Sequence, residues 1–202
     1  MNIEKGRSWG SLSPLPPDGV IIKTNKELLE KVDNCKRQGI DLPTFGLLGG
    51  DLWRTLGGRR AEERLYGGEA TTLDIDLGCA LLDGKIFWFC AHMFIGSKLK
   101  GDKIFISNVA LYGKTNPAPK AHPGDGKFDM LEVELSLFQT FKAVKRVSAG
   151  THIPHPGIKY RQVSSEQFSF GKKLSIEIDG KNIGKFSTVS IRIENEALRV
   201  VI

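Results

Sequence analysis

The N-terminal part of the chain switches from a strand pattern to a helix pattern. Residues 19–24 (GVIIKT) are a short apolar run, which predicts a strand. Residues 24–39 carry apolar side chains at helical spacing, and this predicts a helix. Thr24 and Glu27 are placed as a capping box at its start, and Gly39 is placed to end it.

A second apolar run leads into a glycine-rich segment. Residues 44–50 (TFGLLGG) predict a strand, and Asp51 is placed to cap a short helix over residues 52–56. Strand, helix, strand, loop and helix therefore follow one another in the first part of the chain. Their order is that of one βαβ-like unit.

After residue 67 the pattern becomes that of β-strands. Alternating apolar and polar positions, as in the runs SIEI and SIRI, are typical of half-buried antiparallel strands. Asp83-Gly84 indicates a hairpin turn, and the amphipathic pattern of residues 137–150 predicts one inserted helix. Strands are expected within residues 71–82, 85–94, 102–113, 128–135, 158–163, 173–178, 187–193 and 197–202.

These patterns predict an α+β fold that is mainly β. We expect an antiparallel two-sheet β-sandwich with an N-terminal βα fragment and one inserted amphipathic helix. Residues 1–19, rich in proline, glycine and serine, are expected to form an irregular arm. Residues 20–66 would then hold the βα fragment, and residues 67–202 the sandwich.

The composition narrows the class of protein. Among 202 residues, 40% are hydrophobic and 26% are charged, as in an ordinary soluble globular protein. No apolar run approaches the roughly 20 residues of a membrane span, and no signal peptide is expected. Cys35, Cys79 and Cys90 lack metal-ligand spacing, which favours reduced thiols and a cytoplasmic location.

The net charge of +6 permits attraction to nucleic acid, anionic lipid or phosphorylated ligands, or it serves solubility alone. The basic residues are dispersed along the chain and are not interleaved with aromatic residues. A nucleic-acid partner is therefore not expected.

Gly49, Gly50, Asp51 and Arg54 form the first candidate site. Glycines let backbone N–H groups turn toward an anion, and a helix N-terminus adds partial positive charge, so phosphate binding is one interpretation. A capped turn is the other, because an aspartate repels a phosphate unless a cation intervenes. The segment is neither a Walker A loop nor a GxGxxG motif. Three further arginines could gather around an anion or could line a solvated helical face: Arg59, Arg60 and Arg64.

Asp125 and Asp129 form the second candidate site. The two carboxylates are four residues apart with a glycine bend between them, so they could share a hard cation through oxygen ligands. They could equally be turn residues, because Asp-Gly is a common turn pair.

The remaining candidates have plainer interpretations. His152 and His155 are three residues apart, but Pro154 and Pro156 enforce an extended path that separates the imidazoles, so zinc is not favoured. Three consecutive aromatic residues are expected in the core and on a sheet face, with a lipid-chain groove as the alternative: Phe87, Trp88 and Phe89. Candidate polar contacts at a cleft are Asn108, Asp74 and Asp76.

Several segments, taken in order, resemble the diacylglycerol kinase-like lipid kinases, a family that includes sphingosine and bacterial phospholipid kinases. GLLGGDLWRTLGG is similar to the family's Gly-Thr-Gly-Asn-Asp segment, and LDIDLGCALLDGKIFWFCAHM to its aspartate-leucine-glycine strand and hairpin. NPAPKAHPGDGKFDMLEV resembles the loop before its Asp-Gly-x-Leu-Asp strand, and SIEIDGKNIG and ALRVVI resemble its last strands. The opening RSWG…LPPDG is similar to a compact actinobacterial branch.

The resemblance implies an α/β nucleotide domain followed by a β-sandwich that binds lipid. Residues 20–66 would then be a truncated stub of the nucleotide domain. The family's Gly-Gly-Asp-Gly-Thr nucleotide motif is absent, which argues against ATP binding. By the same resemblance, Asp125 and Asp129 match aspartates linked to a structural Mg²⁺, the one cofactor that the sequence suggests.

A family turn with a catalytic role is altered in this chain. The turn usually reads Asp-Gly-Glu, and its Glu is the favoured catalytic acidic residue. Here Asp179 and Gly180 are kept and Lys181 replaces the Glu, which leaves Asp179 as the catalytic candidate. A protonated ammonium cannot accept a proton from a lipid hydroxyl, so this exchange argues against catalysis.

The leading hypothesis is a lipid kinase-family homologue that is degenerate as a stand-alone kinase and retains binding of a lipid or phosphorylated small molecule. One alternative is an active ATP- and Mg²⁺-dependent kinase that uses the nucleotide domain of a partner chain. The other is a non-catalytic interaction module, which would pair with a second copy as a homodimer and so cover exposed apolar surface.

Overall fold

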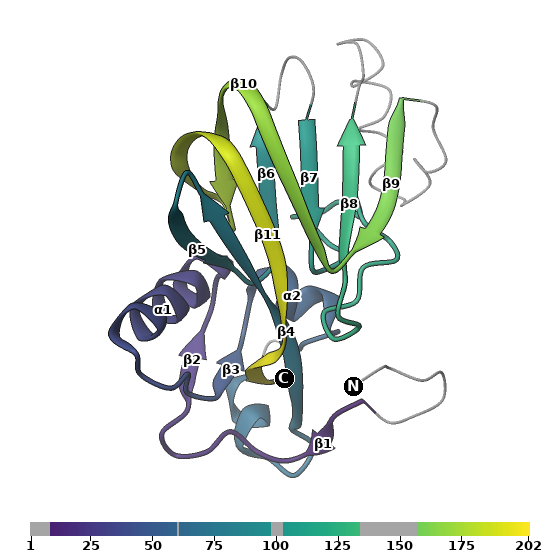
Figure 1. Ribbon diagram of the computed structural model, residues 1–202. Coiled ribbons are helices and arrows are strands. Elements are labelled where there is room, and N and C mark those ends of the chain that lie inside the picture. The colour runs from purple at the N-terminus through teal and green to yellow at the C-terminus, as the bar shows by residue number, and fades with distance from the viewer. Residues whose placement is uncertain (1–8, 60, 98–102, 134–156) are drawn as a thin grey trace.

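The computed structural model describes residues 9–59, 61–97, 103–133 and 157–202. Figure 1 shows two helices beside one end of a strongly curved sheet. The helices are α1 (Asn25–Gln38) and α2 (Gly50–Thr55), followed by a 3₁₀ turn, η1 (Glu62–Tyr66). The strands of the described residues are β1 (Ser11–Leu12), β2 (Val20–Ile22), β3 (Phe45–Leu47), β4 (Thr71–Leu82), β5 (Lys85–Phe89), β6 (His92–Gly96), β7 (Lys103–Ser107), β8 (Phe128–Val133), β9 (Ile158–Val163), β10 (Ser165–Ile178) and β11 (Lys181–Val201).

The predicted βαβ unit is confirmed. β2 and β3 are parallel and α1 connects them, with the hydroxyl of Thr24 accepting the N–H of Glu27 at 3.1 Å. The carboxylate of Glu27 accepts the N–H of Lys23 rather than that of Thr24, so only half of the expected capping box forms. Gly39 ends α1 with a φ of +66°, a left-handed value that suits glycine.

The β part is antiparallel, as expected, but its strands form one hydrogen-bonded sheet. The strand order is β1-β4-β11-β10-β6-β7-β8-β9, with β5 beside β4 and β3 beside β11. The long strands β10 and β11 curve from one side of the molecule to the other (Figure 1). The two layers of the expected sandwich are therefore two halves of a single curled sheet.

One core lies between the two halves of the curled sheet. The rings of Phe89 on β5 and Phe128 on β8 face each other there, with centroids 5.1 Å apart. Both side chains are fully buried, together with Leu82, Met93 and Ile176. A second core joins the helices to the sheet through residues that include Leu28, Val32, Phe45, Ile75 and Leu198.

Some elements differ from the sequence prediction. The runs at residues 187–193 and 197–202 belong to one strand, β11, which a bulge interrupts between Glu194 and Leu198. The arm expected to be irregular contributes β1, which pairs with β4. The predicted helix at 137–150 lies outside the described residues. None of the helices within the described ranges has the length and apolarity needed to cross a membrane.

We predict that Phe89→Ala lowers the free energy of unfolding by about 3–5 kcal/mol, because it opens a cavity between the two halves of the sheet. Ile86→Ala, on the same strand but 45% exposed in the native protein, should cost less than about 1 kcal/mol. Urea denaturation of both variants measures the difference. Equal losses would contradict a core between the halves.

Candidate ligand-binding site

The glycine pair before α2 allows close packing against the start of α1. A Cβ atom on Gly49 would lie 2.2 Å from the carbonyl oxygen of Lys23, and one on Gly50 would lie 2.4 Å from the Asn25 Oδ1. Gly50 also has a φ of +93°. The N–H of Asp51 donates to the Asn25 Oδ1 at 2.7 Å, so this amide already has a partner.

Asp51 does not cap α2, so this expectation was wrong. Gly49 is the N-cap residue and provides no side-chain hydrogen bond. The Asp51 carboxylate points away from the helix start and accepts the N–H of Gly113 at 2.9 Å and the side-chain amide of Asn25 at 2.8 Å. It is buried and joins α1, α2 and the loop at residue 113.

Two further side chains, those of Arg54 and His92, complete the Asp51 cluster. Arg54 donates to the Asp51 Oδ1, and the Nε2 of His92 lies 3.5 Å from the Oδ2. Burial raises the pKa of Asp51, but the hydrogen bonds from His92 and Arg54 outweigh this effect and hold the pKa well below its usual value. The carboxylate is therefore fully engaged within the protein. Phosphate binding at Gly49, Gly50, Asp51 and Arg54 remains an untested prediction.

His92 connects the Asp51 cluster to the sheet. Its Nε2 lies 2.9 Å from the carbonyl oxygen of Leu111, which can only accept, so Nε2 carries a proton. Its Nδ1 lies 3.0 Å from the Ser107 hydroxyl. The imidazole stacks on Phe105, with ring centroids 5.2 Å apart, and the ring of Tyr112 lies at 80° to it, also with centroids 5.2 Å apart.

Asp179 occupies the turn between β10 and β11. Its φ is +47°, and Gly180 follows with +84°. The carboxylate accepts three backbone N–H bonds, from Cys90 at 2.7 Å, Ala91 at 3.0 Å and His92 at 2.7 Å. Burial raises the pKa of Asp179, and the three N–H bonds act against this rise. These contacts tie the turn to the corner between β5 and β6.

A cavity of about 230 Å³ lies beside His92 and Asp179. Its walls are mainly apolar, formed by Phe94, Phe105, Tyr112 and Pro117. The other lining residues are polar or small: His92, Lys103, Thr115, Glu177, Asp179 and Gly180.

Of the predicted site residues, only Asp179 lines this cavity, while Asp51 lies behind His92. The sequence analysis did not select His92 or Lys103. The one indication in the sequence is that each is a polar residue within an otherwise apolar strand.

The two aspartates of the predicted cation site interact. Asp129 on β8 is fully buried, and the side-chain amide of Gln162 donates to its carboxylate at 3.4 Å. Burial, reinforced by the charge of Asp125, raises the pKa of Asp129 to about 7. In the described ranges no cluster of three or more His, Cys, Asp or Glu could hold a metal. Mg²⁺ keeps several waters and often binds only one or two carboxylates, so binding of this ion at Asp125 and Asp129 remains an untested prediction.

The other candidates have structural contacts or lie elsewhere. Asp76 is buried and accepts the N–H of Gly126 at 2.8 Å and that of Glu196 at 3.0 Å. Asp74 forms an exposed ion pair with Arg199, and both residues line a pocket beside β1, as expected for a polar contact at a cleft. Fully buried candidates are Asn108 and Phe89, whereas Phe87 and Trp88 line a second cavity beside α1. The candidates that lie outside the described residues are Arg60, His152 and His155.

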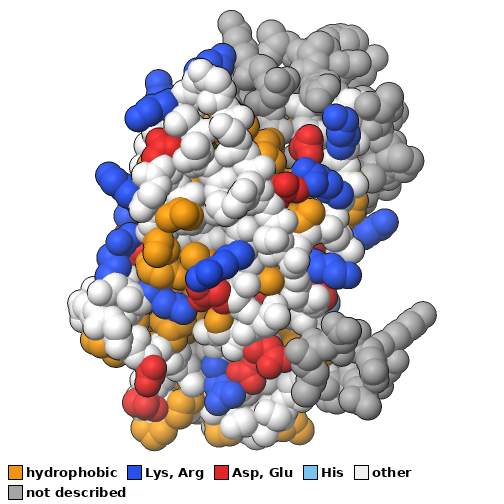
Figure 2. Space-filling model, viewed as in Figure 1, with side chains coloured by type: hydrophobic (Ala, Val, Ile, Leu, Met, Phe, Trp, Pro, Cys, Tyr) orange, Lys and Arg blue, Asp and Glu red, His pale blue; other side chains and the backbone are white. Residues whose placement is uncertain are grey.

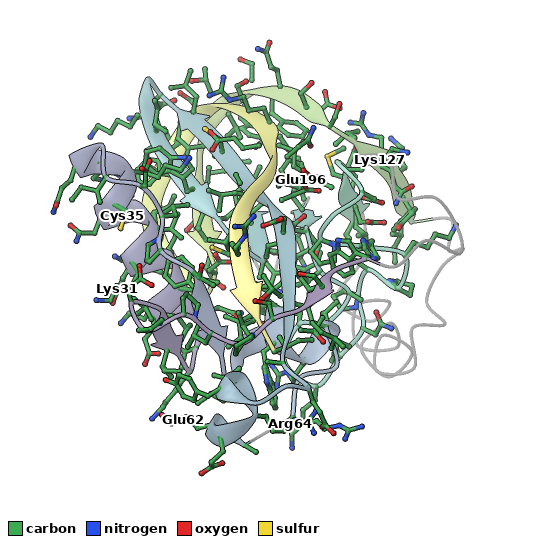
Figure 3. The ribbon with its side chains drawn as sticks, turned by 90° about the horizontal axis from the view of Figure 1, so that it is seen from below. Lys31, Cys35, Glu62, Arg64, Lys127 and Glu196 are labelled. Carbon is green, nitrogen blue, oxygen red and sulfur yellow. The ribbon has the colours of Figure 1, made fainter. Side chains whose placement is uncertain are left out.

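Arg54 and Arg64 do not share one anionic partner. Arg54 is bound to Asp51, and the Arg64 guanidinium lies 3.7 Å from Glu69. Figure 3 shows Arg64 on η1, well apart from Lys127 and Glu196. Figure 2 shows Lys and Arg side chains spread over one face without a dense patch, as expected from the sequence.

Comparison with known proteins identifies relatives in sequence and in fold. Residues 88–202 match the family described as the YegS C-terminal NAD kinase beta sandwich-like domain. Two solved structures of a "putative diacylglycerol kinase" from Bacillus anthracis str. Sterne are similar, with a TM-score of 0.72 and 14% identity over 91% of this chain and 77% of theirs. A structure described as diacylglycerol kinases of that strain has a TM-score of 0.67 at 14% identity, over 91% of this chain and 75% of its own. No curated protein matches the chain.

We predict that Asp51→Asn lowers the free energy of unfolding by about 3 kcal/mol at pH 7, because it removes a buried carboxylate that is paired with the Arg54 guanidinium. The folded pKa of Asp51 is depressed, so its contribution is complete above the unfolded pKa of about 3.9 and is lost as the pH falls below it. Chemical denaturation at pH 7 and pH 3 should therefore show a smaller difference at pH 3. Asp74→Asn, in an exposed ion pair, is the control and should cost less than about 1 kcal/mol.

Asp129 should make stability fall as the pH rises. Its folded pKa of about 7 lies above the unfolded value, so the folded state holds a proton that the unfolded state has lost. Melting temperatures in the presence of a chelator should decrease from pH 4 to pH 8, and Asp129→Asn should flatten this decrease.

Added Mg²⁺ tests the cation prediction at the same residues. If the pair binds the ion, Mg²⁺ at pH 8 should raise the melting temperature of the native protein and leave that of Asp129→Asn unchanged. The same increase in both proteins would place any Mg²⁺ effect elsewhere.

Proposed function

Because the chain belongs to the YegS C-terminal NAD kinase beta sandwich-like family, we propose that it binds a lipid or phosphorylated small molecule and does not phosphorylate it on its own. Its fold is that of the diacylglycerol kinase-like lipid kinases, as the sequence resemblance suggested.

The observation that carries the proposal is the turn at Asp179–Lys181. General base catalysis needs a carboxylate that can reach and accept the proton of a lipid hydroxyl. The Asp179 carboxylate is buried and occupied by three backbone N–H groups. Lys181 is exposed and cationic. The turn thus offers no available base.

The Gly49–Asp51 segment supports the same conclusion. Phosphoryl transfer depends mainly on positioning and neutralising the phosphates of the donor. Gly49 and Gly50 are packed against α1, and the N–H of Asp51 is bonded to Asn25. The Gly-Gly-Asp-Gly-Thr nucleotide motif does not occur in the 202 residues.

The cavity beside Asp179 is the proposed ligand site. Mainly apolar walls with a few polar groups are typical of small-molecule sites. The volume of about 230 Å³ is modest, so the cavity would enclose part of a lipid rather than the whole molecule. The three cysteines are free thiols, which fits the cytoplasmic location that we propose.

One observation favours an interaction module as a second candidate function. Leu81 on β4 and Ile86 on β5 are register partners, and each is 45% exposed. Exposed apolar neighbours on a sheet can pair with a second copy of the chain. Sedimentation of the native protein and of a Leu81→Lys variant tests this: a dimer that Leu81→Lys dissociates would support the module.

We predict that short-chain diacylglycerol, lysophosphatidate or a long-chain base raises the melting temperature, whereas ATP with Mg²⁺ raises it no further than Mg²⁺ alone. Binding to the folded state alone stabilises by about 2.7 kcal/mol at a ligand concentration of 100 Kd. A coupled assay should detect no ADP release with any of these lipids. Turnover of roughly 1–100 per second, as in ordinary kinases, would contradict the proposal.

A further inference from the structure

Lys103 is a buried cation at the wall of the cavity. It is the first residue of β7, is only 7% exposed and lines the cavity. No hydrogen bond or ion pair to its ammonium group is found in the part of the chain that the structure describes. The Lys103 nitrogen is not among the fully buried polar atoms that lack a partner, so it keeps accessible surface. An accessible ammonium group at the wall of a mainly apolar cavity is placed to pair with an anionic group of a bound ligand.

The buried carboxylates of the described residues have hydrogen-bond partners, unlike the ammonium group of Lys103. Asp51, Asp76 and Asp179 each accept backbone N–H bonds, and Asp129 has the amide of Gln162. The fold thus provides a partner for each of these charges and none for Lys103. Glu177, the other acidic residue of the cavity wall besides Asp179, is engaged in a contact of its own.

The strand register places Lys103 at one end of an apolar strip. Lys103 and Phe105 are two residues apart on β7, so their side chains lie on the same face. Phe94 on β6 is the register partner of Phe105, and Gly96 is that of Lys103. If the anionic group of a ligand binds the Lys103 ammonium, the hydrocarbon chain of the ligand would therefore lie against the rings of Phe94 and Phe105.

The size of the cavity limits the apolar part of a ligand. A cavity of roughly 150 Å³ holds a benzene molecule. The cavity of about 230 Å³ is therefore too small for two acyl chains side by side and suits the first part of one chain.

We propose that this cavity binds a single-chain anionic amphiphile, with Lys103 as the counter-ion of its carboxylate or phosphate group and Phe94 and Phe105 as the wall for its chain. The inference rests on the proposed function, because it names the ligand class for the same cavity. With Lys103 as the counter-ion, the cavity would favour an anionic lipid over neutral diacylglycerol.

The test uses isothermal titration of the full chain with four ten-carbon probes below their micelle concentrations. Decanoate and decyl phosphate carry the anion, decanol is neutral, and decyltrimethylammonium carries the opposite charge. We expect the anionic probes to bind at least about tenfold more tightly than the other two. A decyl phosphate affinity above that of decanoate points to a phosphate headgroup, and the reverse points to a fatty acid.

Two variants isolate the ammonium group. Lys103→Met keeps the length and apolar stem of the side chain and should weaken anion binding at least about tenfold while leaving decanol binding unchanged. Lys185→Met removes an exposed lysine on β11 and should change neither. Without ligand, Lys103→Met should melt at the same temperature as the native protein or higher, because Met keeps the apolar stem and the ammonium group makes no hydrogen bond or ion pair within the described residues.

Three results would overturn the inference: equal binding of decanol and decanoate, decanoate binding that survives Lys103→Met, or a lower melting temperature for unliganded Lys103→Met. If diacylglycerol stabilises the protein while neither anionic probe binds, the ligand class is wrong and the proposed lipid-binding function stands. If no lipid or probe binds, both fail.

Discussion

Carboxylates that accept backbone N–H bonds hold the loops of this protein to its sheet. Asp179 binds the corner between β5 and β6, Asp76 binds the bulge of β11 and the loop at Gly126, and Asp51 binds the loop at Gly113. An unpaired buried N–H group and an unpaired buried carboxylate are each costly. A hydrogen bond from a backbone N–H group to a carboxylate satisfies both groups at once. The arrangement of the cavity wall depends on such hydrogen bonds.

This constraint changes how acidic residues in family motifs are interpreted. Asp179 lies in a turn where the resemblance implies catalysis, yet its oxygens hold three N–H groups of the neighbouring strand corner. Asp51 likewise replaces an expected helix cap with contacts to α1, β6 and a distant loop. A motif identifies the position of such a residue, but the partners of its side chain decide what it can do.

The sequence predicted what depends on neighbours along the chain. The cap at Thr24, the end of α1 at Gly39 and the hairpin at Asp83 all appear in the structure, because each is fixed by a few adjacent residues. The single curled sheet was not predicted, since its closure depends on pairing between distant strands. Lys103 and His92 were missed because nothing in an apolar strand indicates that a cavity opens beside one of its residues.

The length of β11 links the site to the N-terminal unit. This strand of 21 residues starts at Lys181, next to the turn of Asp179, and ends beside β3 in parallel pairing. Along the way it pairs with both β10 and β4. Global opening of β11 would therefore break the cavity wall and the βαβ unit together. Slow amide exchange along this strand would report one cooperative unit rather than two domains that unfold separately.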